Sequence, residues 1–168
     1  MAIFDSGERR EFKTGAVRDI QENKGRCDLL PLDIVGNILT HDVFFFHLDA
    51  YVRSGNTDGL YNAIHAVING YYHDDYTAIL ELAKHYEEGA NKYSERNWEK
   101  GIPLHCYIDS AVRHYLKELR GDYDESHLRA VLWNLVGALW THEHKPELID
   151  LPFAKEKDNE SNTHTADA

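Results

Sequence analysis

A helix rich in carboxylates meets a loop rich in cations between Glu87 and Gly101. The helix contributes the adjacent acids Glu87 and Glu88. The residues that follow combine cations with an amide and an indole: Lys92, Arg96, Asn97, Trp98 and Lys100. Carboxylates bind divalent metal ions, and cations bind phosphate oxygens. The stretch therefore predicts a site where a phosphate and its metal could meet.

Other polar residues recur at the edges of two later apolar helix faces. Asp109 is followed one turn later by Arg113, and Asp124, His127 and Asn134 share nearly one line. If these edges converge, they would surround one cavity with carboxylates, imidazoles and a guanidinium, as helical bundles do when they build metal sites. Plainer interpretations stay open: Asp109 and Arg113 have the spacing of a surface ion pair contributing about 0.3 kcal/mol, and Asn134 could be a satisfied core amide.

The periodicity of the carboxylate helix predicts which acid points inward. Apolar residues fall on one stripe of a 3.6-residue period: Ile79, Ala83, Tyr86, Ala90 and Tyr93. This phase predicts that Glu87 reaches the interior and that Glu88 lies at its mouth.

The elements that must position these residues are all helical. Helical periodicity and start and stop signals predict helices over residues 32–53, 57–70, 75–93, 103–121 and 125–142, with a break in the first at Thr40 and His41. The expected fold is an all-α bundle of about five helices with an irregular N-terminal arm. The predicted organisation is an arm at 1–31, a single catalytic domain at 32–153 and a disordered tail at 154–168.

Composition excludes several classes of function. A formal net charge of −11 argues against a nucleic-acid partner, since such binding depends on Lys and Arg. No run approaches the roughly 20 apolar residues that span a bilayer, so no membrane partner is expected. Two widely spaced cysteines, Cys27 and Cys106, favour a reducing compartment, and we expect a cytoplasmic protein.

Several short motifs resemble one family in order along the chain. They are residues 14–19, residues 24–31, residues 89–93 with Asn97-Trp98, Asp109 with Arg113-His114, and His127-Leu128 with Trp133-Asn134. Together they resemble the dATP/dGTP diphosphohydrolases of phages, the MazZ-type relatives of the MazG-like all-α nucleoside triphosphate pyrophosphatases. The resemblance covers residues 14–142, and residues 40–75 look like an insertion.

The resemblance implies hydrolysis of a purine (deoxy)nucleoside triphosphate to the monophosphate and pyrophosphate, with Mg²⁺ or Mn²⁺ as cofactor and a homodimer or homotetramer as the assembly. Glu87 or Asp109 would orient the attacking water. The implied metal ligands are Glu87, Glu88, Asp109, Asp124 and Glu125. The implied substrate-binding residues are Lys24, Arg26, Lys92, Arg96, Asn97, Trp98, Arg113, His114, His127 and Asn134.

The chain departs from the family's paired-acid pattern. A MazG-like ExxE motif would place an acid at position 91, which is Asn91, and Asp124-Glu125 are adjacent rather than spaced. Two alternatives therefore stay open. One is a nucleotide-binding or sequestering protein without turnover. The other is a structural protein whose helices assemble through Trp133, Trp140 and the aromatic run at residues 44–46.

Overall fold

The structure is a computed structural model that describes residues 7–20, 24–72 and 74–154. Apart from Ala154, the predicted tail lies outside the described residues. The α-helices are α1 (Leu32–Ile38), α2 (Val43–Ser54), α3 (Asp58–Tyr71), α4 (Asp75–Lys92), α5 (Leu104–Arg120) and α6 (His127–His144). Short 3₁₀ helices are η1 (Cys27–Leu29), η2 (Asn97–Lys100) and η3 (Pro146–Leu148). The predicted all-α class is confirmed.

The predicted interruption of the first helix is also confirmed. Thr40 and His41 have φ angles of 59° and 62°, in the left-handed region that an α-helix cannot continue through. The chain therefore turns between α1 and α2. At the other predicted boundaries, Pro103 directly precedes α5 and Gly121 ends it with a φ of 82°.

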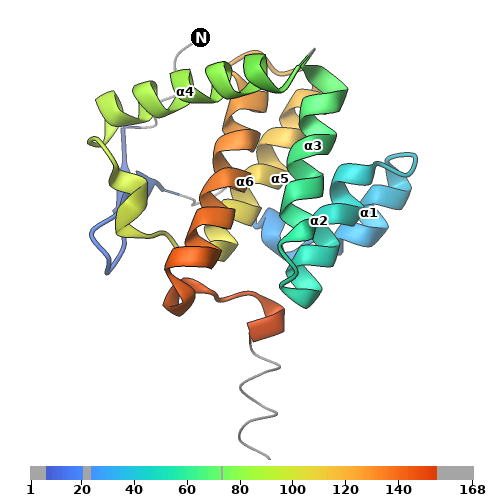
Figure 1. The fold of residues 1–168 in the computed structure, drawn as a ribbon, viewed down its shortest axis with the longest axis horizontal. Coiled ribbons are helices and arrows are strands. Elements are labelled where there is room, and N and C mark those ends of the chain that lie inside the picture. Colours follow the sequence, from blue (N-terminus) through green and yellow to red (C-terminus); the bar gives the residue numbers. More distant parts are fainter. Residues whose placement is uncertain (1–6, 21–23, 73, 155–168) are drawn as a thin grey trace, which may run out of the picture.

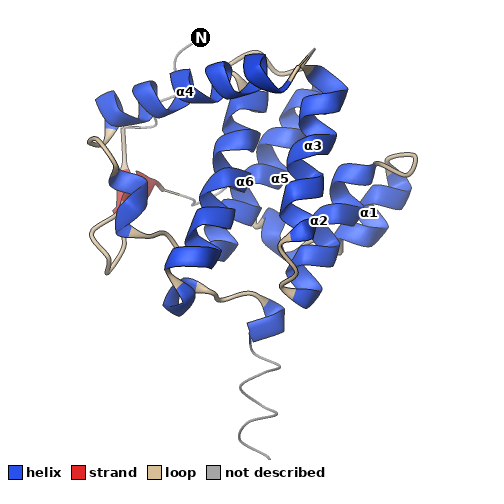
Figure 2. Cartoon of the chain, in the orientation of Figure 1, coloured by secondary structure: helices blue, strands red, loops and turns tan. Residues whose placement is uncertain are grey.

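The N-terminal arm contains a small hairpin that no alternation in the sequence indicated. Strands β1 (Arg9–Glu11) and β2 (Val17–Asp19) pair antiparallel, with Arg9 opposite Asp19. Three-residue strands are too short for a period of two to be recognised. Figure 2 shows this hairpin as the red strands, beside η2 and away from α1 and α2.

The core lies among α2, α3, α5 and α6, and α4 lies across one end of α6 (Figure 1). Its largest fully buried side chains include Phe44, Phe45, Tyr51, Leu60, Tyr107, Ile108, Leu132 and Leu135. Phe44 and Phe45 are therefore wrong as an assembly surface, because the core already covers them. Among the described residues, no helix is long and apolar enough to cross a membrane.

Helix α4 is rotated by about one residue from its predicted phase. Its buried residues are Ala78, Leu82 and His85, whereas Ile79 is 56% exposed. One residue corresponds to about 100° of rotation, which brings the polar edge of this helix toward α6. The predicted orientation of the paired acids is consequently wrong: Glu88 is half-buried against α6 and Glu87 is exposed.

Gly59 permits the close packing of α3 on α2, which leads to a stability prediction. A Cβ atom at this position would lie 2.7 Å from the backbone oxygen of His47 and 2.9 Å from Tyr51 Cβ. Gly59→Ala should lower the free energy of unfolding by about 2 kcal/mol, because the two backbones must separate. The matched control is Gly70→Ala in the same helix, where nothing lies within 4 Å; it should stabilise the protein by roughly 0.5 kcal/mol. Urea denaturation measures both, and equal effects would contradict the packing argument.

Candidate active site

A cavity of about 1080 Å³ lies between the hairpin, α4, η2, α5 and the start of α6. It is lined by most of the predicted site residues: Lys24, Glu87, Arg96, Asn97, Trp98, Asp109, Arg113, His114, Asp124, Glu125 and Asn134. The predicted residues that do not line it are Arg26, Glu88, Lys92 and His127. The tertiary structure thus gathers side chains of the N-terminal arm and of three later helices around one space of a size suited to a small molecule.

The hairpin is fixed to the helices by the side chain of Asn97. Its Oδ1 accepts a hydrogen bond from the Val17 amide at 3.0 Å, and its Nδ2 donates to the Val17 carbonyl at 2.9 Å. Asn97 therefore completes the edge of β2, as a paired strand would. Its amide is occupied in this way, which argues against the predicted contact with a nucleotide base.

Arg18 on β2 is a cavity residue that sequence reasoning missed. Its guanidinium donates to the carbonyl of Cys106, to Ser110 Oγ and to Asn134 Oδ1, at 3.2, 3.1 and 2.9 Å. It also lies over the rings of Tyr107 and Trp133, 5.4 Å from each centroid. In the described part of the chain these hydrogen-bond acceptors are all neutral, so the positive charge of Arg18 is available to an anion in the cavity.

Asn134 belongs to the same group of contacts. Its Oδ1 accepts from Arg18, and its Nδ2 donates to the Ala130 carbonyl at 2.7 Å. The side chain thus orients the arginine instead of presenting both ends of its amide to a ligand. The signal that could have found Arg18 was the resemblance of residues 14–19, because this residue is the one cation in that motif.

Asp109 holds the N-terminal arm against α5. Its Oδ1 accepts from the Cys27 amide at 2.6 Å, and its Oδ2 pairs with Arg113. The Arg113 guanidinium also donates to the carbonyls of Lys24 and Gly25, both at 3.3 Å. The carboxyl group of Asp109 is almost fully buried and both its oxygens have protein partners, an arrangement that argues against the predicted roles of metal ligand and water-orienting carboxylate.

The two adjacent acids of α4, Glu87 and Glu88, lie in different environments. Glu87 lines the cavity and is exposed, whereas Glu88 Oε1 lies 3.2 Å from Nη1 of the buried Arg129 on α6. On the same side of α4, His85 packs 6.0 Å from the Trp133 ring and also lines the cavity. Burial, with Arg129 and Arg18 nearby, lowers the pKa of His85 to about 4, so this imidazole is neutral at physiological pH.

The predicted cations differ in their accessibility. Lys92 is almost buried and its Nζ lies 2.8 Å from Asp19 Oδ2. Arg26 donates hydrogen bonds to the Asp28 carboxylate, which raises the pKa of Arg26. Lys24 lies at the cavity and partial burial lowers its pKa, while Arg96 is exposed at the rim and pairs with Glu99.

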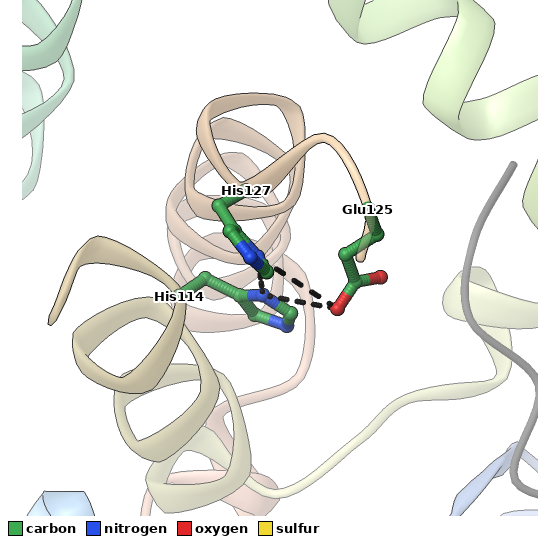
Figure 3. Close-up of side chains that lie close together, drawn as sticks. All are labelled: His114, Glu125 and His127. Atoms are coloured by element: carbon green, nitrogen blue, oxygen red, sulfur yellow. Dashed lines mark hydrogen bonds and ion pairs between the residues drawn. The ribbon is translucent and has the colours of Figure 1, made fainter. Parts of the chain in front are cut away.

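Two groups of side chains bring three metal-ligand atoms within 4.8 Å of one another. The first contains His114, Glu125 and His127 (Figure 3), and the second contains Asp122, Asp124 and His127. Figure 3 shows His114 coming from α5, His127 from the first turn of α6 and Glu125 from the chain just before it. Glu125 and Asp124 were predicted metal ligands, whereas His114 and His127 were predicted to bind substrate. Among the described residues, the predicted set made only of carboxylates does not come together.

Comparison with known proteins identifies the region that builds most of this cavity. Residues 71–151 match a protein-family model described as dATP/dGTP diphosphohydrolase, N-terminal. The matched region spans α4, α5 and α6 and excludes the hairpin and nearly all of α1–α3, so the family resemblance of the arm stays a prediction. Searches of curated proteins and of solved structures found no match.

Proposed function

We propose that the protein hydrolyses purine (deoxy)nucleoside triphosphates, dATP or dGTP, to the monophosphate and pyrophosphate, because residues 71–151 match the family model described as dATP/dGTP diphosphohydrolase, N-terminal. The proposed place of this reaction is the cavity between the hairpin and α4–α6. The observation that carries the proposal is Arg18, whose charge enters the cavity with neutral acceptors around it.

Several cations in the lining of the cavity support the proposal of a triphosphate ligand. Although the chain carries a net charge of −11, cations from several elements reach this space: Arg10, Arg18, Lys24, Arg96, Arg113, Lys117 and Arg120. A guanidinium can hold two phosphate oxygens at once, so Arg18 is the proposed central phosphate ligand. Lys24 and Arg96 are the proposed ligands of the outer phosphates.

Aromatic rings line the other part of the cavity and suit the purine. Trp98 packs edge-on against Tyr86 and Trp140, with centroids 5.7 and 4.9 Å away. These contacts hold its indole in place, and both Trp98 and Tyr86 line the cavity. A base stacked on such a ring gains roughly 1–3 kcal/mol. We propose that the purine lies against Trp98.

Metal dependence, on Mg²⁺ or Mn²⁺, is part of the proposal. Both groups of convergent donor atoms include an imidazole, a ligand that Mg²⁺ seldom takes and transition metals accept readily. The donor set therefore favours Mn²⁺ over Mg²⁺. A bound divalent ion would supply charge neutralisation at the phosphates and a more acidic water. Glu87, an exposed carboxylate that lines the cavity, is the proposed water-orienting base.

We further propose a homodimer or homotetramer in a phage-infected cytoplasm, as the family resemblance implies. The surface that supports assembly differs from the predicted aromatic run. Exposed apolar side chains cluster on the outer side of α4, where Tyr76, Ile79 and Leu80 are 83%, 56% and 66% exposed. Such a surface is typical of a contact between protein subunits.

The decisive experiment is to incubate the protein with each of the eight common NTPs and dNTPs, with Mn²⁺ or Mg²⁺, and to measure monophosphate and pyrophosphate. We expect dATP or dGTP to give equal amounts of both products, and EDTA to abolish the reaction. Tight nucleotide binding in calorimetry without any turnover would instead support a sequestering protein, which the missing acid at position 91 favours. Absence of both binding and turnover would overturn the proposal.

A further inference from the structure

We infer that His114, Glu125 and His127 form a transition-metal site with one side open to the cavity. The three ligand atoms already lie at the spacings of a coordination shell. His114 Nδ1 is 3.2 Å from His127 Nδ1 and 3.4 Å from Glu125 Oε1, and His127 Nδ1 is 3.8 Å from the same oxygen. Figure 3 shows the three side chains close together, with dashed lines joining these atoms.

The distances between the three ligand atoms are close to those in a zinc site. A point equidistant from the three atoms lies about 2.0 Å from each, and Zn²⁺ binds His nitrogen and carboxylate oxygen at about 2.0–2.2 Å. Ligand atoms of a tetrahedral site at that distance are about 3.4 Å apart. Two imidazoles and one carboxylate with a free fourth position are the donor set of zinc sites that bind water or substrate.

The group also brings two largely buried imidazole rings close together. Their rings lie 5.4 Å apart between centroids, and both side chains are largely or fully buried. At 3.2 Å, at most one of the facing Nδ1 atoms can carry a proton, so a lone pair is directed into the shared space. A metal ion bound here would be coordinated by that lone pair and by the Glu125 carboxylate.

Asp124 is a positioning residue for this site. Its Oδ1 lies 2.9 Å from His127 Nε2, and its Oδ2 lies 2.8 Å from Lys117 Nζ. Within the described residues the buried Nε2 makes no hydrogen bond of good geometry, and a small rotation of the half-exposed Asp124 carboxylate supplies one. Metal-ligating histidines usually have a carboxylate behind the second nitrogen, which fixes the tautomer and directs the other nitrogen to the metal.

The second group of donor atoms is less suited to a metal. Both of its acids form ion pairs with cations: Asp122 pairs with Arg120, and Asp124 pairs with Lys117. The first group has two members at the cavity, His114 and Glu125, whereas the second has one, Asp124. The ion would therefore be placed where it can meet a ligand held by the cavity.

The test measures metal binding without nucleotide, so its outcome is separate from that of the hydrolysis assay. The EDTA-treated full-length protein is titrated with Zn²⁺ by calorimetry and with Co²⁺ by visible absorption. We expect one metal ion per chain, with the intense visible bands of four-coordinate Co²⁺. His114→Gln and Glu125→Gln should each weaken Zn²⁺ binding at least 100-fold, and Asp124→Asn should weaken it about 10-fold.

His65→Gln is the matched control, because His65 is an exposed histidine on α3, and it should leave the affinity unchanged. If His114→Gln fails to fold, Glu125→Gln, which alters only the segment before α6, decides the result. Unchanged Zn²⁺ binding in a folded Glu125→Gln protein would overturn the inference. So would loss of binding on Asp122→Asn alone, since that would place the ion at the second group.

Discussion

Replacing Arg18 with methionine should lower kcat/KM for dATP or dGTP about 100-fold. Methionine keeps the apolar stem over Tyr107 and Trp133 but removes the charge and the hydrogen-bond donors. A hydrogen bond between charged groups contributes roughly 1.5–3 kcal/mol, and about 2.7 kcal/mol corresponds to a 100-fold change. Steady-state assays give kcat/KM, and calorimetry with the same nucleotide gives the loss of binding.

Two further variants make this prediction specific. Arg18→Lys keeps the charge without the planar fork, so it should recover only part of the loss. Arg53→Met is the matched control, because Arg53 is an exposed arginine of α2 that pairs with Asp49 outside the cavity. Thermal unfolding of each variant separates lost binding from lost folding. A change below threefold in a folded Arg18→Met protein would remove Arg18 from the proposed phosphate site.

Replacing Asp109 with alanine should lower the free energy of unfolding by about 3 kcal/mol. The change leaves the Arg113 guanidinium without its carboxylate and the Cys27 amide without its acceptor. Breaking a buried ion pair by removing one partner costs about 3–5 kcal/mol, and the Lys24 and Gly25 carbonyls that remain near Arg113 offset some of this. Denaturation by urea measures the effect.

The control for this second prediction is Asp49→Ala, which breaks an exposed pair with the same i,i+4 spacing. It should change the free energy of unfolding by less than about 0.5 kcal/mol. Asp109→Asn separates structure from chemistry, because it preserves the shape of the side chain. If that variant kept full stability yet lost all turnover, Asp109 would be a catalytic residue rather than the anchor of the arm.

The sequence determined the helices and their ends, because those signals are local. Thr40 and His41 interrupt the first predicted helix, and Gly121 ends α5 in the left-handed region. Such features depend on backbone conformation and helical period within a few residues. The hairpin was missed because its pairing joins three-residue strands and is completed by Asn97, about 80 residues away.

The candidate site depended on tertiary structure wherever a side chain's role is set by a distant partner. The i,i+4 spacing of Asp109 and Arg113 is the same on a surface and in an interior, and only the arm packed over them makes the pair buried. The observed phase of α4 likewise includes a contact that forms only after folding, the pairing of Glu88 with Arg129 on α6. Sequence could rank polar residues, but it could not show which charges neutralise one another.

The sequence by itself therefore determined an all-α fold, the break between α1 and α2 and the group of residues from which a phosphate site could be built. Tertiary structure decided that the Arg18 guanidinium donates its hydrogen bonds to neutral acceptors and that the Asp109 carboxylate binds the N-terminal arm. It also decided that His114 and His127 face each other beside Glu125. The physical reason is the range of the interactions. Helix formation is decided between neighbours in the chain, whereas burial and electrostatic pairing are decided by residues that meet only after folding.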